Sequence, residues 1–202
     1  MVDRWWIGGS PCSGKSTVAG MLAASWQLPL YRCDDAFARH AAVVEPAAEP
    51  TLKKVTAMPI GDRLAQPIEV QVGDVVRGYR EEFPLIVQDL AGAGPILVEG
   101  AALLPDLLAG LDVPRNRAVW MVPAEDFQRH HYRRRQWAHD LLASLVDADG
   151  AFDRWMRRDA VFARLVAEQA RRLGYPVVSV DGTAEPADVA ASVEDLLDLS
   201  RT

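Results

Sequence analysis

The stretch Gly9-Ser10-Pro11-Cys12-Ser13-Gly14-Lys15-Ser16-Thr17, close to the start of the chain, decides the fold. It fits the pattern G-x-x-x-x-G-K-[ST], in which backbone N–H groups converge on phosphate oxygens because the glycines tolerate turns that a Cβ would forbid. In this pattern Lys15 places a positive charge on the β- and γ-phosphates, and the Ser16 hydroxyl can ligate Mg2+. We therefore expect a phosphate-binding loop in which the Lys15 side chain faces solvent while the loop is empty.

The segments on either side of this loop support the same interpretation. Before it, Trp5-Trp6-Ile7-Gly8 is typical of a short buried strand. After it, apolar residues recur at helical spacing, at Val18, Leu22 and Trp26. A strand, a glycine-rich turn and a helix form the setting that the motif requires. The alternative, a turn with an incidental lysine, does not explain this setting, so the sequence predicts binding of a nucleoside triphosphate.

Composition bounds the class of protein. Of the 202 residues, 50% are hydrophobic and 25% are charged, as in an ordinary globular domain. The formal net charge of −6 argues against a nucleic-acid groove, and we expect neither a membrane span nor a signal peptide. Cys12 and Cys33 suit a reducing compartment. We expect a single cytoplasmic domain over residues 1–202, with no nucleic-acid or membrane partner; the oligomeric state stays open.

Apolar segments alternate with helical ones along the chain, which is typical of an α/β fold with a parallel sheet. We predict a five-stranded sheet with helices on both faces, its strands near residues 5–8, 28–33, 95–100, 117–122 and 177–180. Residues 36–94 are too long for a plain crossover, so we interpret them as a helical substrate-binding insertion. Within it, Pro84 predicts a break or kink in a helix over 72–90. One long helix is expected from about 124 to 146, inside a lid region spanning 124–150.

Two adjacent carboxylates, Asp34 and Asp35, follow the second predicted strand. Ligands of open α/β sheets bind at the carboxyl ends of the strands, which is where this pair falls. A carboxylate there can accept the proton of a substrate hydroxyl that attacks a γ-phosphate, or can hold that hydroxyl in line. The alternative is a helix N-cap, and one residue could cap while the other acts.

Glu99 ends the apolar run Ile96-Leu97-Val98, where such proteins carry the acid that orders Mg2+ and its waters. The more usual residue there is Asp, and an ordinary strand-end acid is the alternative. A functional role is favoured because the run Ile96-Leu97-Val98-Glu99-Gly100 is otherwise devoid of charge. We therefore predict that Ser16 and Glu99 serve the metal.

A basic cluster lies within the predicted lid, and Arg129, Arg133 and Arg134 are its candidate catalytic residues. Arginines on a mobile lid can neutralise the charge that spreads over a transferred phosphoryl group. A solvated basic face, balanced by nearby acids, is the alternative. The segment Arg157-Arg158-Asp159 is a competing basic site.

Taken together, these residues resemble the small P-loop kinases related to nucleoside monophosphate kinases. Cys33-Asp34-Asp35-Ala36-Phe37 is similar to a pattern in zeta-toxin-like kinases, chloramphenicol phosphotransferase, and shikimate and gluconate kinases. This resemblance implies the three-layer P-loop NTPase sandwich, ATP and Mg2+, and an acceptor-binding or basic role for Asp35. Val98-Glu99-Gly100 is similar to a strand of uridine-kinase-like enzymes.

The resemblance extends to two further segments. Residues 129–135 look like the lid of these kinases, and Asp181-Gly182-Thr183 is similar to the loop that flanks their adenine. The sequence lacks the Asn-Lys-x-Asp motif and the ABC signature, which argues against a GTPase or a transporter ATPase. Residues 36–94 match no family pattern, so the acceptor is not implied.

Two functions from different classes follow. The first is an ATP- and Mg2+-dependent kinase that phosphorylates a hydroxyl, or a phosphate, of a small acceptor. A nucleotide or nucleoside acceptor and a sugar, antibiotic or acid acceptor both stay open. The second is a nucleotide-binding regulator without turnover. A large apolar patch on residues 43–94 would favour the regulator, whereas a polar pocket facing Asp35 would favour the kinase.

Overall fold

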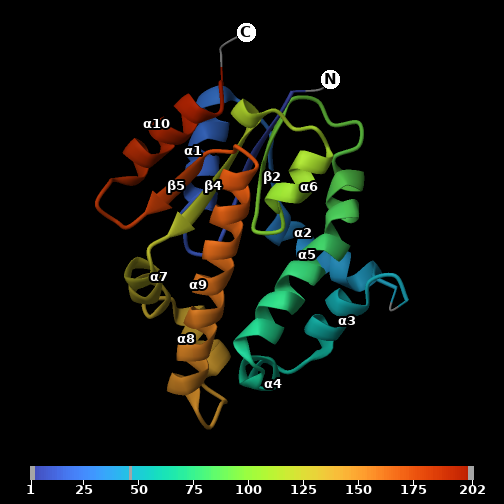
Figure 1. Ribbon diagram of the computed structural model, residues 1–202, viewed down its shortest axis with the longest axis vertical. Coiled ribbons are helices and arrows are strands. Elements are labelled where there is room, and N and C mark those ends of the chain that lie inside the picture. The colour runs from blue at the N-terminus through green and yellow to red at the C-terminus, as the bar shows by residue number, and fades with distance from the viewer. Residues whose placement is uncertain (1–2, 46, 200–202) are drawn as a thin grey trace.

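The computed structural model describes residues 3–45 and 47–199, and its centre is one parallel five-stranded sheet in the order β2-β3-β1-β4-β5 (Figure 1). The strands are β1 (Arg4–Gly9), β2 (Leu30–Arg32), β3 (Ile96–Glu99), β4 (Ala118–Pro123) and β5 (Val177–Val180). The helices are α1 (Lys15–Trp26), α2 (Cys33–Val43), α3 (Pro50–Ala57), α4 (Ile60–Ala65), α5 (Ile68–Asp89), α6 (Pro105–Gly110), α7 (Glu125–Tyr132), α8 (Gln136–Leu142), α9 (Ala148–Arg172) and α10 (Pro186–Leu196), with a 3-10 turn over Arg115–Arg117.

The sheet is the middle of three layers, because alternate residues of its strands enter two separate cores. Trp5, Ile7 and Met121 pack with α1 and α10 on one face. Trp6 and Trp120 pack with α5, α6 and α9 on the other face. Both faces are therefore covered, which explains why these strands are apolar throughout. The predicted α/β fold with a parallel five-stranded sheet is confirmed.

Helix α5 continues through Pro84 as one helix of 22 residues, so the predicted break is wrong. A proline removes one backbone hydrogen bond and crowds the carbonyl four residues earlier. Arg80 and Pro84 are both exposed, so water can hydrate that carbonyl. Phe83 and Ile86, on the buried side of the helix, lie in the core and hold α5 in place.

The predicted single lid helix is also wrong, because the chain turns over Arg133–Arg135 and forms α7 and α8. The rings of Tyr132 and Trp137 both contact Trp155 of α9, at 5.1 and 5.7 Å between centroids. Residues five apart on one continuous helix point about 140° from each other, so they could not share one partner. The shared contact with Trp155 therefore requires the turn.

The insertion and the lid meet at the end of the molecule away from the two termini (Figure 1). Leu64 of α4 shares a small core with Tyr132, Ala138 and Leu142 of the lid and with Trp155 of α9. The start of α9 thus supports both regions.

Among the helices that the structure describes, none is long and apolar enough to cross a membrane.

Candidate active site

The phosphate-binding loop connects β1 to α1, and glycines shape it. Gly9 has φ of 128°, and a Cβ there would collide with the backbone oxygen of Met121. Gly14 has φ of 79° and precedes the first residue of α1. No side chain caps this helix end, so its N–H groups are available to an anion. The loop thus has the backbone geometry of a phosphate site.

Lys15 is buried, which corrects the expectation that it faces solvent. Its Nζ donates a hydrogen bond of 2.7 Å to the carbonyl oxygen of Ser10, inside the loop. The Ser13 hydroxyl donates to the same oxygen at 3.0 Å. Burial lowers the pKa of Lys15, and the carboxylates of Glu99 and Asp34 oppose that shift. The lysine therefore lies between the loop and two acids.

Strand register places Glu99 between the phosphate-binding loop and the end of β2. On β3 it pairs with Ile7 of β1 on one side and with Arg32 of β2 on the other. Burial raises the pKa of Glu99, while the charge of Lys15 and a hydrogen bond with the Ser16 side chain lower it. The two residues predicted to serve Mg2+ are thus in contact with each other.

The oxygen atoms of Ser16 and Glu99 fit the ligand preference of Mg2+. Within residues 3–45 and 47–199, no group of three or more His, Cys, Asp or Glu side chains could hold a metal by itself.

A cavity of about 300 Å3 opens beside these residues, between the end of β2, the insertion and α9. Apolar residues of α2, α3 and α5, such as Phe37, Leu52 and Val75, form part of its wall. Its polar lining consists mainly of Asp34, Arg63, Asp74, Tyr79, Glu82 and Arg158. Its size suits a small molecule.

The two adjacent carboxylates are placed differently. Asp34 lines the cavity and interacts electrostatically with Lys15, and its negative charge also contributes to the raised pKa of Glu99. Both residues are exposed in the first turn of α2, but Asp35 is not part of the cavity wall. The geometry therefore brings Asp34, rather than Asp35, to the phosphate-binding loop.

The opposite part of the cavity is basic, through Arg63 of α4 and Arg158 of α9. Burial lowers the pKa of Arg63, and the charge of Arg158 lowers it further. Arg158 donates two hydrogen bonds to Asp159, at 2.8 and 2.6 Å, whereas the buried Nε of Arg63 has no partner among the described residues. The basic triplet that contains Arg158 was visible in the sequence, but nothing there indicated Arg63.

A second cavity, of about 350 Å3, lies on the other side of the loop. Cys12, Ser13, Gly14 and Thr17 of the phosphate-binding loop line it, together with Phe127, His131, Arg135, Gly182 and Glu185. Gly182 has φ of 86°, and Phe127 packs where a Cβ would lie. Asp181 accepts hydrogen bonds from Thr183 and fixes this turn. We call it the nucleotide cavity and the first one the acceptor cavity.

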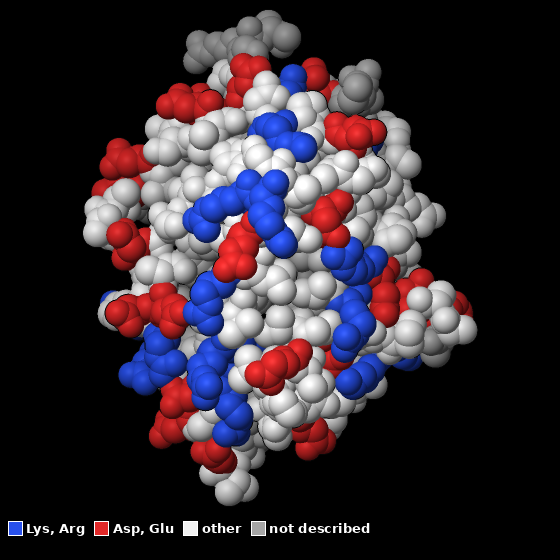
Figure 2. All heavy atoms as spheres, viewed as in Figure 1, with Lys and Arg blue, Asp and Glu red and all other residues white. Residues whose placement is uncertain are grey.

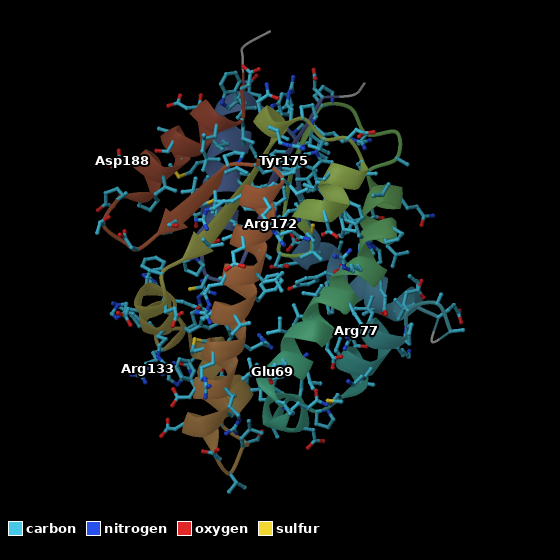
Figure 3. All side chains as sticks on the ribbon, in the orientation of Figure 1. Glu69, Arg77, Arg133, Arg172, Tyr175 and Asp188 are labelled. Atoms are coloured by element: carbon cyan, nitrogen blue, oxygen red, sulfur yellow. The ribbon has the colours of Figure 1, made fainter. Side chains whose placement is uncertain are left out.

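The three predicted lid arginines lie outside both cavities. Arg129 pairs with Asp153, Arg133 lies 5.5 Å from the ring centroid of Phe152, and Arg134 contacts His130 at 3.3 Å. Figure 3 shows Arg133 on the lid side of α9, across that helix from α5. In Figure 2, basic side chains gather over this end of the molecule and alternate with acidic ones. The arginine that reaches the nucleotide cavity is Arg135, which the sequence interpretation did not single out.

Comparison with known proteins identifies the fold. No protein family model and no curated protein matches the sequence. Shikimate kinase from Bacteroides thetaiotaomicron has a similar structure, with a TM-score of 0.56, 13% identity, and 98% of this chain and 100% of that chain covered. Shikimate kinase from Acinetobacter baumannii, solved in complex with shikimate, gives a TM-score of 0.52 at 12% identity, over 99% and 97% of the two chains. An uncharacterized protein from Eubacterium ventriosum gives 0.51 at 12% identity, over 98% and 99%.

At such low identity these likenesses show the fold alone. The chain has a P-loop kinase-like fold, as its sequence implied. The substrate has to be argued from the site.

Proposed function

We propose that this protein is an ATP- and Mg2+-dependent kinase that phosphorylates a hydroxyl group of a small acceptor. The observation that carries this proposal is the position of Asp34, which lines the acceptor cavity and interacts with Lys15 of the phosphate-binding loop. A hydroxyl beside Asp34 would therefore lie next to a phosphate held by the loop.

In the proposed reaction, the acceptor oxygen attacks the γ-phosphorus of ATP, and the bond from that phosphorus to the β–γ bridging oxygen breaks. Asp34 takes the proton of the hydroxyl as the new P–O bond forms. Lys15 and the free N–H groups of the loop balance the charge that moves to the β-phosphate. Mg2+, held by Ser16 and through water by Glu99, would supply further neutralisation of phosphate charge.

The acceptor cavity favours a molecule that carries an anionic group in addition to the hydroxyl. Arg63 and Arg158 line the cavity, and guanidinium groups can donate hydrogen bonds to a carboxylate or phosphate. A guanidinium pair in a buried setting is stable when an anion lies between its members. A small hydroxy acid fits the acidic and basic parts of the cavity together.

The regulatory alternative has less support. The large hydrophobic side chains exposed in the described part of residues 43–94 are Val43 and Val70, which lie at the end of α2 and the start of α5. They form no continuous apolar patch of the kind that a partner protein needs. The cavity between the insertion and the sheet is instead lined by charged groups.

Phosphorus NMR with ATP and Mg2+ tests the proposal on a panel of acceptors. The panel contains hydroxy acids (shikimate, D-gluconate, D-glycerate), neutral polyols, nucleosides and nucleoside monophosphates. We expect a phosphate-ester signal with a hydroxy acid that disappears with EDTA and with Asp34→Asn. ATP binding without ester formation from any compound would contradict the kinase proposal and favour the regulator.

A further inference from the structure

A second carboxylate, Glu82 of α5, faces the acceptor cavity and has no role in the proposed phosphoryl transfer. It is 1% exposed as a residue, and its Oε1 lies 2.9 Å from Nδ1 of His40. The other ring nitrogen of His40, Nε2, lies 2.9 Å from Oδ2 of Asp89. Glu82, His40 and Asp89 thus form a buried chain from the cavity wall toward the surface.

Each ring nitrogen of His40 lies within hydrogen-bond distance of a carboxylate oxygen. An ionised carboxylate can only accept, so a proton must lie between each ring nitrogen and its carboxylate partner. The pair of Glu82 and His40 therefore holds one proton more than a neutral imidazole and a free carboxylate. Asp89 is compensated separately, by two hydrogen bonds from Arg39, at 2.8 and 2.7 Å, and one of 2.6 Å from Tyr31.

Only one oxygen of Glu82 is used by this chain of hydrogen bonds. In the described part of the protein no hydrogen bond reaches Oε2, and this atom is not among the fully buried polar atoms that lack a partner. Because Glu82 lines the acceptor cavity, Oε2 is the oxygen left for a bound acceptor. Burial raises the pKa of Glu82, hydrogen bonding to His40 opposes this, and the nearby charge of Asp34 adds to the rise.

We propose that Glu82 is a specificity-determining residue for the acceptor: its Oε2 accepts a hydrogen bond from a second acceptor hydroxyl, and His40 is the residue that positions it. This inference rests on the proposed function, in which Asp34 takes the first hydroxyl. The partner of Glu82 is a hydroxyl rather than an ammonium group, because the proton shared with His40 already compensates its charge. The site therefore selects polyhydroxylated acids over acids with one hydroxyl.

Equilibrium binding of matched acceptor pairs tests this inference separately from turnover. The loop is first filled with the non-hydrolysable analogue AMP-PNP and Mg2+, and binding is followed by saturation-transfer NMR and calorimetry. The pairs are D-glycerate with 3-hydroxypropionate, and shikimate with its monodeoxy analogues. We expect the wild-type protein to prefer the polyhydroxylated member by about tenfold, the effect of one hydrogen bond to a buried acceptor.

Two substitutions at one position separate hydrogen bonding from charge. Glu82→Met removes the acceptor oxygen and should abolish the preference. Glu82→Gln keeps an oxygen that can face the cavity while its amide donates to neutral His40, so the preference should largely persist. If both variants lost the binding preference equally, the negative charge of Glu82 would be its cause. That result would overturn the assignment of a hydroxyl as the partner of Glu82. Glu69→Met is the control, since Glu69 is exposed on the same helix (Figure 3).

The positioning role of His40 has its own matched pair. The amide of His40→Asn replaces Nδ1, the nitrogen that contacts Glu82, whereas that of His40→Gln replaces Nε2, the nitrogen that contacts Asp89. We expect the asparagine variant to keep more of the preference. If His40 only linked α2 to α5, its substitution would lower the melting temperature and leave the binding ratio unchanged.

The possible failures are distinguishable. If Glu82→Met is folded, binds AMP-PNP normally and retains the wild-type binding ratio, this inference is wrong and the kinase proposal stands. If the wild-type protein binds neither member of any pair, the proposed hydroxy-acid acceptor is itself wrong.

Discussion

The nucleotide and acceptor sides of the candidate site are built by different means. Nine consecutive residues, 9–17, form the phosphate-binding loop, and its backbone and one lysine make most of the site. The acceptor cavity is lined by side chains from α2, α3, α4, α5 and α9, which are spread over residues 33–158 of the sequence. In the proposed reaction, a local motif would hold one substrate, whereas residues that only the fold brings together would hold the other.

The largest expected effect lies where these two sides meet. Asp34→Asn keeps the size of the side chain but removes the base, so turnover with an acceptor should fall about a hundredfold to ten-thousandfold. ATP affinity, measured by calorimetry, should change little. Asp35→Asn is the matched control, because Asp35 is exposed outside the cavity. A dead Asp35 variant with an active Asp34 variant would reverse the two roles.

A large effect is also expected on the nucleotide side alone. Lys15→Met fills the buried volume but removes the charge, and the rate should fall about a hundredfold to a thousandfold, as when one transition-state donor is lost. ATP affinity should weaken as well, in contrast to Asp34→Asn. Lys53→Met, on the exposed face of α3, serves as the control. Undiminished ATP affinity in the Lys15 variant would contradict the nucleotide assignment.

The same contrast explains what could be predicted from the sequence. The loop, the sheet and Glu99 depend on local spacing and on strand ends, so their placement followed from the pattern of residues. The choice between Asp34 and Asp35 depends on the angle at which α2 leaves β2, and no local pattern encodes that angle. Arg63 lies in a short helix whose position depends on contacts with α9, so the sequence carried no signal for it.

The errors in the lid have a similar origin. Helical propensity alone favoured one helix over 124–146, and the break at Arg133–Arg135 follows from the contacts of two lid rings with Trp155. That break turns Arg135, and none of the three chosen arginines, into the nucleotide cavity. Tertiary contacts decided the outcome against local preference.

A third prediction concerns the stability of the acceptor side. Hydrogen bonds from Arg39, Tyr31 and His40 hold the pKa of Asp89 well below its usual range, although burial opposes them. A depressed carboxylate pKa stabilises the folded state above the unfolded pKa of about 4, and this contribution is lost as the pH falls toward the folded value. Asp89→Asn should therefore lower the free energy of unfolding by about 1–3 kcal/mol at pH 7.

Urea denaturation of wild type and variant at pH 7 and pH 3 measures this effect. The difference between them should shrink at pH 3, because Asp89 is then largely protonated in the unfolded wild-type chain, which stabilises the unfolded state, while the folded carboxylate stays ionised. Asp195→Asn, on the exposed face of α10, should cost little at either pH. A difference that is equal at both pH values would show that shape, not charge, matters at Asp89.

The smallest effect is expected from the lid, and it sharpens the assignment of the nucleotide cavity. Arg135 lines this cavity, and its charge lowers the pKa of Cys12, which burial raises. Because Arg135 is exposed, its contact with phosphate is screened, and Arg135→Gln should weaken ATP binding by no more than about tenfold. The loss should shrink further at high salt.

Arg134→Gln is the control, because Arg134 contacts His130 outside the cavity. This variant should leave ATP affinity unchanged. If the Arg134 variant binds ATP more weakly than the Arg135 variant, the lid must close with its other face toward the nucleotide.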